Sequence, residues 1–161
     1  MPGLGGGHDA VTTGEYLEAS SCSSTTTMRI LVLCTGNSCR SQMAEAWLRH
    51  YLPDASIRSA GIEAHGVNPR AAAAMADVGL PLDGHTSDTL GELPDGAWDV
   101  VVTVCDHARD VCPVLPGTHR TVHAPFPDPA QATGTEAEIM AQFREVRDRI
   151  GRWAEAFASA V

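Results

Sequence analysis

Short apolar runs and longer amphipathic stretches alternate along the chain from residue 29 onwards. Strands are predicted at residues 30–33, 56–60, 98–104 and 121–123. Helices are predicted at residues 41–52, 69–78 and 135–159. The run at 98–104 is almost entirely apolar, which is typical of a strand buried on both faces of a parallel sheet. The alternation predicts an α/β fold, a three-layer open sandwich of about four parallel strands with helices on both faces.

The first 27 residues differ in composition from the rest of the chain. They are built largely from Gly, Ser and Thr, which offer too little apolar surface to fold. We expect a disordered tail over residues 1–27, in which Cys22 has no role, and a single domain over residues 28–161. No run approaches the roughly 18 apolar residues of a membrane span. The first basic residue is Arg29, so a signal peptide is not indicated and the expected location is the cytoplasm.

The charged residues limit the chemistry that is open to the chain. Its 161 residues carry 11 basic side chains, all of them arginine, against 20 acidic ones, a formal net charge of −9. The absence of lysine excludes Schiff-base and pyridoxal chemistry and a phosphate loop of the Walker type. The acidic balance argues against nucleic acid or an anionic membrane as a partner. An anionic ligand would therefore be held by arginine and backbone N–H groups in one local pocket.

The segment between the first predicted strand and helix, CTGNSCR at residues 34–40, has the features of an anion-binding loop. In open α/β folds, ligands bind beyond the carboxyl ends of strands, where helices begin. Gly36 and Asn37 tolerate unusual backbone angles, so the loop can curl and direct its N–H groups inward. Arg40 adds a guanidinium that can hold two oxygens. The predicted oxyanion-binding residues are Thr35, Gly36, Asn37, Ser38, Cys39, Arg40 and Ser41.

Cys34 is the candidate nucleophile of this loop. The positive field of the loop and helix is expected to lower the pKa of Cys34 and to supply a thiolate, with Ser41 as a hydrogen-bond donor to it. A Cys-x5-Arg-Ser pattern also arises by chance, and a glycine-containing turn with a buried thiol is the alternative. The position of the pattern between a strand and a helix favours the anion-binding interpretation.

A second pair of cysteines, Cys105 and Cys112, follows the third predicted strand. Three interpretations are open, namely two unrelated buried thiols, half of a metal site, or a redox pair. Nearby His107, His119 and His123 make zinc conceivable, but the ligand spacings match no common pattern. In a helix, seven residues would separate the two Cα atoms by about 10.5 Å, whereas a disulfide needs less than about 7 Å. A disulfide between these two cysteines would therefore require any helix here to unwind.

Residues 33–45, LCTGNSCRSQMAE, are similar to the signature of the low-molecular-weight tyrosine phosphatase superfamily. More narrowly, they resemble the thioredoxin-coupled arsenate reductases of that fold. The phosphatases typically carry proline where Gln42 stands. The similarity spans residues 28–157 through shorter segments. These are residues 59–63, 66–69, 85–88, 101–113, 126–129 and 143–148.

The resemblance implies a three-cysteine relay that passes two electrons to arsenate. Cys34 attacks arsenate held by the loop and Arg40, which forms a covalent thiol–arsenate adduct. Cys105 then attacks Cys34, arsenite leaves, and a Cys34–Cys105 disulfide remains. Cys112 next attacks Cys105 and moves the disulfide to Cys105–Cys112, which thioredoxin reduces.

The resemblance also implies a general acid and a cation site. Asp128 would protonate the departing oxygen, whereas by itself it would be read as part of an ordinary Asp-Pro turn. The phosphatases usually have tyrosine where Ala130 stands. A structural potassium ion is implied at Asn37, Glu45, Ser59 and Asp88. No tightly bound cofactor is expected, and thioredoxin is the expected electron donor, with glutaredoxin and mycothiol as alternatives.

Arsenate reduction for arsenic detoxification is the leading functional hypothesis, with weak phosphatase side activity because the pocket is shared. A low-molecular-weight tyrosine phosphatase is the alternative, since it needs only the first half of the chemistry. A sensor that binds arsenite or zinc through Cys105 and Cys112 is the non-enzymatic alternative. We expect a monomer that binds arsenate and forms a transient mixed disulfide with thioredoxin.

Overall fold

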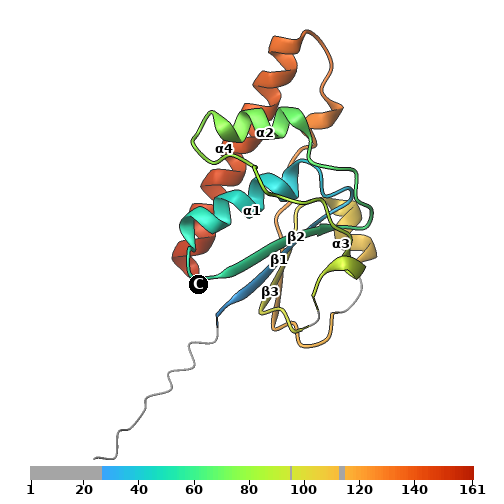
Figure 1. The fold of residues 1–161 in the computed structure, drawn as a ribbon, viewed down its shortest axis with the longest axis vertical. Coiled ribbons are helices and arrows are strands. Elements are labelled where there is room, and N and C mark those ends of the chain that lie inside the picture. Colours follow the sequence, from blue (N-terminus) through green and yellow to red (C-terminus); the bar gives the residue numbers. More distant parts are fainter. Residues whose placement is uncertain (1–26, 95, 113–114) are drawn as a thin grey trace, which may run out of the picture.

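Four parallel strands form one sheet in the computed structural model, which describes residues 27–94, 96–112 and 115–161. The strands are β1 (Arg29–Cys34), β2 (Ser56–Gly61), β3 (Val100–Thr103) and β4 (Arg120–His123). They lie in the order β2-β1-β3-β4 (Figure 1). Cys34 is in register with Gly61, and Leu33 with Thr103, so neighbouring strands end at the same edge. The predicted parallel sheet is confirmed, although β3 is shorter than the predicted run at 98–104.

Helices connect the strands and complete the described chain. They are α1 (Arg40–Tyr51), α2 (Pro69–Ala76), α3 (Asp106–Val111) and α4 (Glu136–Ala160), with short 3-10 helices η1 (Leu90–Glu92) and η2 (Pro129–Gln131). The predicted helices at 41–52, 69–78 and 135–159 correspond to α1, α2 and α4. The fourth helix, α3, has only six residues, which is too short to show an amphipathic pattern in the sequence.

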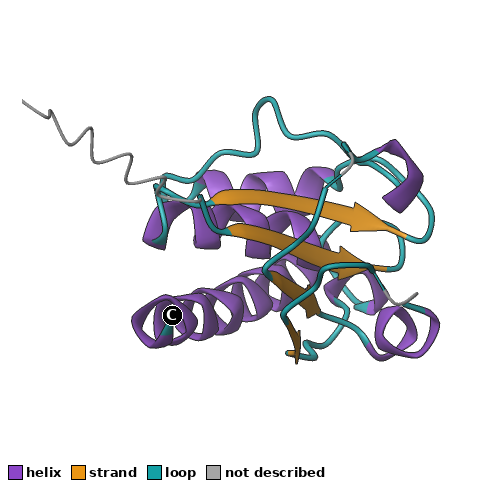
Figure 2. Ribbon diagram, turned by 90° about the horizontal axis from the view of Figure 1, so that it is seen from below, coloured by secondary structure: helices purple, strands orange, loops and turns teal. Residues whose placement is uncertain are grey.

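The helices cover both faces of the sheet. Parallel strands are joined by right-handed crossovers, and the chain moves in opposite directions from β1 to β2 through α1 and from β3 to β4 through α3. The two helices therefore lie on opposite faces, and Figure 1 shows α1 and α4 on one side of the strands and α3 on the other. Seen from below, the strands run between the helices (Figure 2). The predicted three-layer arrangement is confirmed.

The core lies where α1 and α4 pack beside β1. Residues 30–33 of β1 have no exposed surface, so this strand is covered on both faces. The buried apolar residues of α4 recur at spacings of three and four, which is the pattern of a helix with one buried face. Trp47 of α1 donates its Nε1–H to the carbonyl of Arg147 at 3.1 Å. The same ring lies so close to Gly151 that a Cβ there would be 2.8 Å from it, so the two helices are in direct contact.

β1 lies at the point where the order of the strands reverses, with β2 on one side and β3 on the other. In open parallel sheets, ligands bind at the carboxyl edge at such a point. Cys34 is the last residue of β1, and α1 begins only six residues later at Arg40. The fold therefore places the predicted nucleophile and the predicted anion-binding loop at the ligand-binding edge of the sheet.

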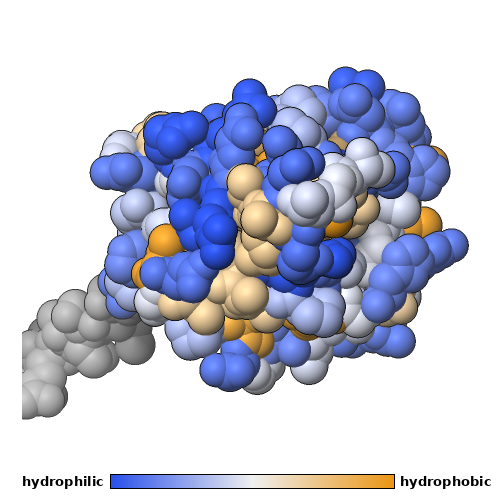
Figure 3. Space-filling model, turned by 90° about the horizontal axis from the view of Figure 1, so that it is seen from above, coloured by the Kyte–Doolittle hydropathy of each residue, from blue (hydrophilic) through white to orange (hydrophobic). Residues whose placement is uncertain are grey.

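The sequence predicts an N-terminal tail and indicates no membrane-spanning segment. The tail predicted over residues 1–27, including Cys22, lies outside the described residues except for Thr27, and the domain boundary at residue 28 stays a prediction. Within the described part, no helix combines the length and the apolar character that crossing a membrane requires. On the face seen in Figure 3, hydrophobic residues form small areas between hydrophilic ones.

Candidate active site

The loop after β1 turns its carbonyl oxygens outward. The carbonyls of residues 34, 35, 36 and 38 accept hydrogen bonds from backbone N–H groups of residues 62–68, with N···O distances of 2.9–3.3 Å. By contrast, the N–H groups of residues 36–39 donate to no residue that the structure describes. The first turn of α1 begins directly after them, with its own N–H groups at the positive end of the helix. The loop therefore presents donors that can bind an oxyanion.

Asn37 fixes the curvature of the loop. It is the one described non-glycine residue with a positive φ, 45°, a conformation that asparagine tolerates better than most residues. Its buried side chain accepts a hydrogen bond from the hydroxyl of Ser41 at 2.8 Å. Its amide nitrogen donates to the carbonyls of Ser59 and Asp88, both at 3.3 Å. Asn37 thus ties the loop to α1, to β2 and to the segment after α2.

Two glycines allow other segments to approach the loop closely. A Cβ at Gly36 would overlap the ring of His65, which covers the outer side of the loop. A Cβ at Gly61 would be 2.8 Å from the backbone nitrogen of Asn37 and equally close to the carbonyl of Thr35. The end of β2 therefore supports the loop from beneath, and side chains at these two positions would displace it.

Ser41 and Gln42 hold the loop rather than its nucleophile. The hydroxyl of Ser41 was expected to donate to Cys34, but it has a single hydrogen and gives it to Asn37. Gln42 is fully buried, and its amide nitrogen donates to the carbonyls of Asn37 at 3.1 Å and Thr86 at 2.9 Å. The role of Gln42 was missed from the sequence, where it only marked a difference from the phosphatases.

Arg40 extends from the first turn of α1 toward the segment before η2. Its Nη1 donates to the carbonyl of Phe126 at 3.1 Å, and its Nη2 lies 3.6 Å from Oδ2 of Asp128. Its Nε is buried and has no hydrogen-bond partner among the residues described. A buried guanidinium N–H is costly to leave unpaired. The guanidinium is therefore held in place by Phe126 and Asp128, and its Nε–H remains available to a ligand.

Asp128 and the loop line one pocket with a volume of about 270 Å³. Asp128 precedes η2 and accepts the N–H of Ala130 at 3.0 Å through Oδ1, which leaves Oδ2 directed at Arg40. The pocket brings together most of the residues predicted for the site. They are Cys34, Thr35, Gly36, Ser38, Cys39, Arg40 and Asp128, joined by His65, Ala130 and Gln131.

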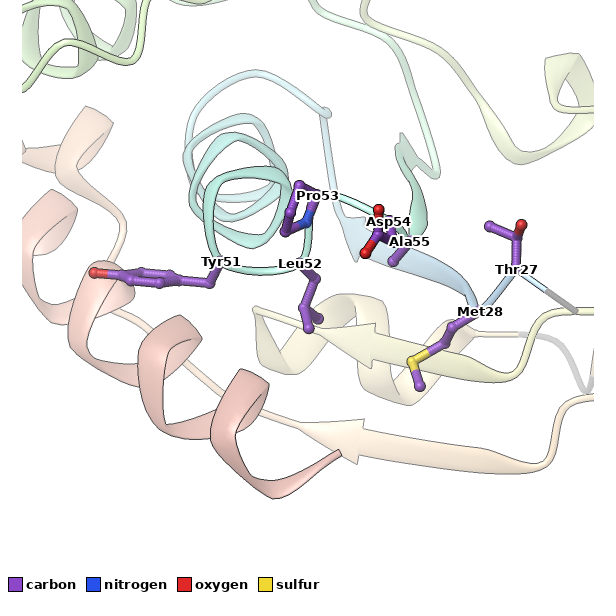
Figure 4. A pocket seen from close by; sticks show the side chains of 7 residues that line it. All are labelled: Thr27, Met28, Tyr51, Leu52, Pro53, Asp54 and Ala55. Carbon is purple, nitrogen blue, oxygen red and sulfur yellow. The ribbon is translucent and has the colours of Figure 1, made fainter. Parts of the chain in front are cut away.

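A larger hollow of about 680 Å³ lies at the opposite edge of the sheet, between the end of α1 and the start of β1 (Figure 4). Its lining is Thr27, Met28, Tyr51, Leu52, Pro53, Asp54 and Ala55. These residues include no cysteine, histidine or arginine. The smaller pocket, which holds a candidate nucleophile, an arginine and an acid, is the candidate active site.

Cys34 and Cys105 form a hydrogen-bonded pair of thiols. The hydrogen bond with Cys105, followed by burial, raises the pKa of Cys34, although the guanidinium of Arg40 acts in the opposite direction. The bond from Cys34 lowers the pKa of Cys105 to about 5, with help from the hydroxyl of Thr35 and the N–H of Ala108. The expected lowering of the pKa of Cys34 is therefore wrong for the ligand-free loop, because its neighbour takes the negative charge.

Cys105 and Cys112 flank α3. Cys105 precedes the helix and its sulfur accepts the N–H of Ala108 at 3.3 Å, while Cys112 directly follows the last helical residue. None of the four described cysteines takes part in a disulfide. Because a complete helix separates Cys105 from Cys112, a bond between them still requires α3 to unwind.

The metal interpretation of this second cysteine pair finds no support in the described residues. They contain no group of three or more His, Cys, Asp and Glu side chains arranged to hold a metal ion. His123 instead bridges Thr103, at 2.8 Å from its Nδ1, and Asp106, at 3.0 Å from its Nε2. This histidine ties β3 and β4 to the start of α3.

The four residues predicted for a potassium ion lie together, and each of them has an oxygen that already accepts a hydrogen bond. Both carboxylate oxygens of Glu45 accept hydrogen bonds, from Arg49 and from Ser59. The side-chain oxygen of Asn37 accepts from Ser41, and Oδ2 of Asp88 accepts from Thr86 at 2.7 Å. These residues do not fit an alkali cation as they stand.

Comparison with known sequences gives one consistent family. The family model for low molecular weight phosphotyrosine protein phosphatases matches residues 29–161. A curated relative from Halalkalibacterium halodurans, named arsenate reductase, is 53% identical over 130 residues, which cover 80% of this chain and 94% of the relative. A relative of the same name from Bacillus subtilis is 50% identical over 130 residues, with 80% and 94% covered.

Solved structures share the fold described above. An arsenate reductase in the phosphate binding state aligns with a TM-score of 0.68 and 26% identity, over 84% of this chain and 99% of its own. A protein tyrosine phosphatase aligns with a TM-score of 0.66 and 26% identity, over 82% and 94%. With the family model matched from β1 to the end of α4, the chain belongs to the low molecular weight phosphotyrosine protein phosphatase family.

Proposed function

We propose that this protein is an arsenate reductase that works through three cysteines. The observation that carries the proposal is a second thiol beside the nucleophile: the sulfur of Cys105 lies 3.4 Å from the hydroxyl of Thr35, the loop residue that follows Cys34. A phosphatase needs one cysteine to form and hydrolyse a covalent intermediate, and a second thiol beside it serves no hydrolytic step. The names of the relatives at about half identity support the same activity.

In the first step, arsenate enters the pocket and takes the free donors. The N–H groups of residues 36–39 and Nε of Arg40 bind its oxygens. As Cys34 attacks arsenic, its proton passes along the existing hydrogen bond to Cys105. One arsenate oxygen leaves as water with a proton from Asp128, and a Cys34–arsenate adduct remains.

In the second step, Cys105 is the nucleophile. The hydroxyl of Thr35 and the N–H of Ala108 still stabilise its thiolate after Cys34 has reacted, so Cys105 gives up the proton again and attacks the sulfur of Cys34. A sulfur–sulfur bond forms and the sulfur–arsenic bond breaks. The electron pair of the broken bond stays on arsenic, which is reduced from the pentavalent to the trivalent state, and arsenite leaves while two thiols are oxidised.

In the third step, Cys112 attacks Cys105 and releases the thiolate of Cys34. The disulfide now joins the two ends of the former α3 segment, and this requires the helix to unwind. The unwound segment exposes the disulfide to a dithiol protein, for which thioredoxin is the proposed donor. Two electrons from that dithiol restore Cys105 and Cys112, and no tightly bound cofactor takes part.

A phosphatase is the second candidate, because Cys34, Arg40 and Asp128 could also cleave a phosphate ester. The likeness to a solved protein tyrosine phosphatase favours it. It would make Cys105 and Cys112 dispensable, so turnover of an aryl phosphate that survives the loss of both would support it.

The test is arsenate-dependent NADPH oxidation with thioredoxin and thioredoxin reductase. We expect multiple turnover by the native protein and at most one turnover by Cys112→Ser. The matched control is Cys22→Ser, which removes a cysteine with no predicted role and should keep the native rate. Multiple turnover by Cys112→Ser would contradict the three-cysteine relay, and no arsenate-dependent oxidation at all would contradict reduction coupled to thioredoxin.

A further inference from the structure

Glu45 is a buried carboxylate directly beneath the anion-binding loop, with only 5% of its surface exposed. Oε1 accepts from Nη2 of Arg49 at 3.0 Å. Oε2 accepts from the hydroxyl of Ser59 at 3.2 Å and lies 3.0 Å from Nδ1 of His85. A buried negative charge needs a positive partner, which has to come from a side chain or a bound cation next to Glu45.

His85 gives a hydrogen bond in either of its charge states. Nδ1 faces two acceptors, Oε2 of Glu45 and Oε1 of Gln42, the latter at 3.1 Å. The orientation of the Gln42 amide is fixed, because its nitrogen donates to Asn37 and Thr86. Nδ1 therefore carries a hydrogen whether or not the ring is charged, so His85 does not by itself supply the permanent positive charge.

Two carbonyl oxygens of the predicted cation site each face a hydrogen-bond donor already. The carbonyls of Ser59 and Asp88 accept from the amide nitrogen of Asn37. This N–H donor points to the place where a cation would have to share the same oxygens, and its partial positive charge would repel one. Among these residues only Oδ1 of Asp88 and the hydroxyl oxygen of Ser59 face no described donor, which is too few oxygens to surround an alkali cation.

Arg49 has the position and the charge to fill this role. It follows Glu45 by one helical turn, and besides the carboxylate its Nη2 donates to the carbonyl of Ile57 at 2.9 Å. The guanidinium thus joins α1 to β2 directly below the loop. It is charged at every accessible pH, and its outer part stays hydrated because 48% of the side chain is exposed.

We propose that Arg49 is the resident cation of this site, so that the protein binds no potassium where the family resemblance implies it. Arg49 acts as a positioning residue: it holds Glu45, which in turn holds Ser59 of β2 and, through His85 and Gln42, the loop residue Asn37. The proposal does not depend on which oxyanion the loop binds, because it concerns the support of the loop.

The test compares unfolding temperatures in potassium chloride and in tetramethylammonium chloride at equal ionic strength. The native protein should unfold at the same temperature in both salts. Arg49→Met should lower the unfolding temperature by about 2–4 °C. It also uncovers Oε1 of Glu45 and the carbonyl of Ile57, so potassium should recover part of that loss while tetramethylammonium should not.

Two further variants separate this effect from a general loss of charge. Arg49→Lys keeps the positive charge and should remain insensitive to potassium. Arg70→Met removes an exposed ion pair with Glu136 and should respond equally to both salts. Specific stabilisation of the native protein by potassium would overturn the proposal. Equal behaviour of Arg49→Met in both salts would also overturn it, and if that variant does not fold, the native protein and Arg49→Lys decide.

Discussion

At the scale of single residues, the site depends on how hydrogen-bond donors are distributed. The carbonyls of the loop are occupied from outside, and the N–H groups of residues 36–39 and Nε of Arg40 are left for a ligand. The two thiols beside them share one negative charge unequally. This arrangement assigns different roles to two cysteines that are chemically identical in the sequence.

Arg40→Lys should weaken the anion site without unfolding the protein. Lysine cannot contact Phe126 and Asp128 and still offer a planar donor to an oxyanion. Loss of a charged hydrogen bond costs about 1.5–3 kcal/mol. We therefore expect kcat/KM for arsenate to fall by roughly 10- to 150-fold in steady-state assays. Arg152→Lys, on the exposed side of α4, is the matched control, and an equal loss there would show that the effect is not local.

The thiolate of Cys105 should be visible by its absorbance at 240 nm. Its pKa of about 5 lies below the ordinary value of 9.0, so one thiolate should form as the pH rises through 5. Cys34→Ala removes the largest cause of this shift and should move the transition to higher pH. An unchanged transition in Cys34→Ala would show that the pair is not the cause.

The lowered pKa of Cys105 also makes the free energy of unfolding depend on pH. Because folding lowers this pKa, Cys105 stabilises the native state above pH 9, and its contribution is lost as the pH falls toward 5. The free energy of unfolding of the native protein should therefore drop more between pH 8 and pH 5 than that of Cys105→Ala. Parallel curves from denaturant unfolding of the two proteins would contradict this expectation.

At the scale of elements, α3 is the part that the proposed reaction changes. It is one short helix, held at its start by the sulfur of Cys105 and by the contact between Asp106 and His123. A six-residue helix gains little stability from its own hydrogen bonds. Its own hydrogen bonds therefore offer little resistance to unwinding.

Oxidation of Cys105 and Cys112 should release α3 and leave α1 intact. Amide hydrogens of residues 109–111 should exchange at least about 10-fold faster in oxidised than in reduced protein, because their helical hydrogen bonds are lost. Those of residues 43–51 in α1 serve as the internal control. Identical exchange of the α3 amides in both redox states would rule out the rearrangement.

The contact between α1 and α4 gives a prediction about stability. Gly151→Ala would place a Cβ within 2.8 Å of the Trp47 ring, so one helix has to shift. Such overpacking costs about 1–3 kcal/mol of the free energy of unfolding, measured in denaturant. Gly91→Ala is the matched control, because nothing lies within 4 Å of a Cβ there. An unchanged stability of Gly151→Ala would mean that the helices adapt freely.

At the scale of the whole molecule, the sequence predicts the sheet, three of four α-helices and the position of the site. These follow from apolar periodicity and from the position of Cys34 after a buried strand. The direction of the Ser41 hydroxyl, the pKa of Cys34 and the pairing of Arg49 with Glu45 are not predictable in this way. Each depends on which of several neighbours takes or gives a hydrogen. Asn37 and Glu45 lie only four residues from Ser41 and Arg49, whereas Cys105 comes from a distant part of the chain.

The net charge of −9 affects how the whole molecule attracts or repels an approaching anion. An acidic surface repels oxyanions at long range, so binding depends on the short-range donors of the loop. Raising the ionic strength should therefore leave the KM for arsenate unchanged or lower it. A KM that rises steeply with salt would indicate long-range attraction by a basic surface instead.

In the proposed relay, reduction of arsenate joins Cys34 and Cys105 in a disulfide. The most direct measurement is mass-spectrometric disulfide mapping of Cys112→Ser after one equivalent of arsenate, with no reductant present. The relay predicts a disulfide between Cys34 and Cys105 together with one arsenite per protein. Arsenate consumed with both cysteines still present as thiols would contradict it.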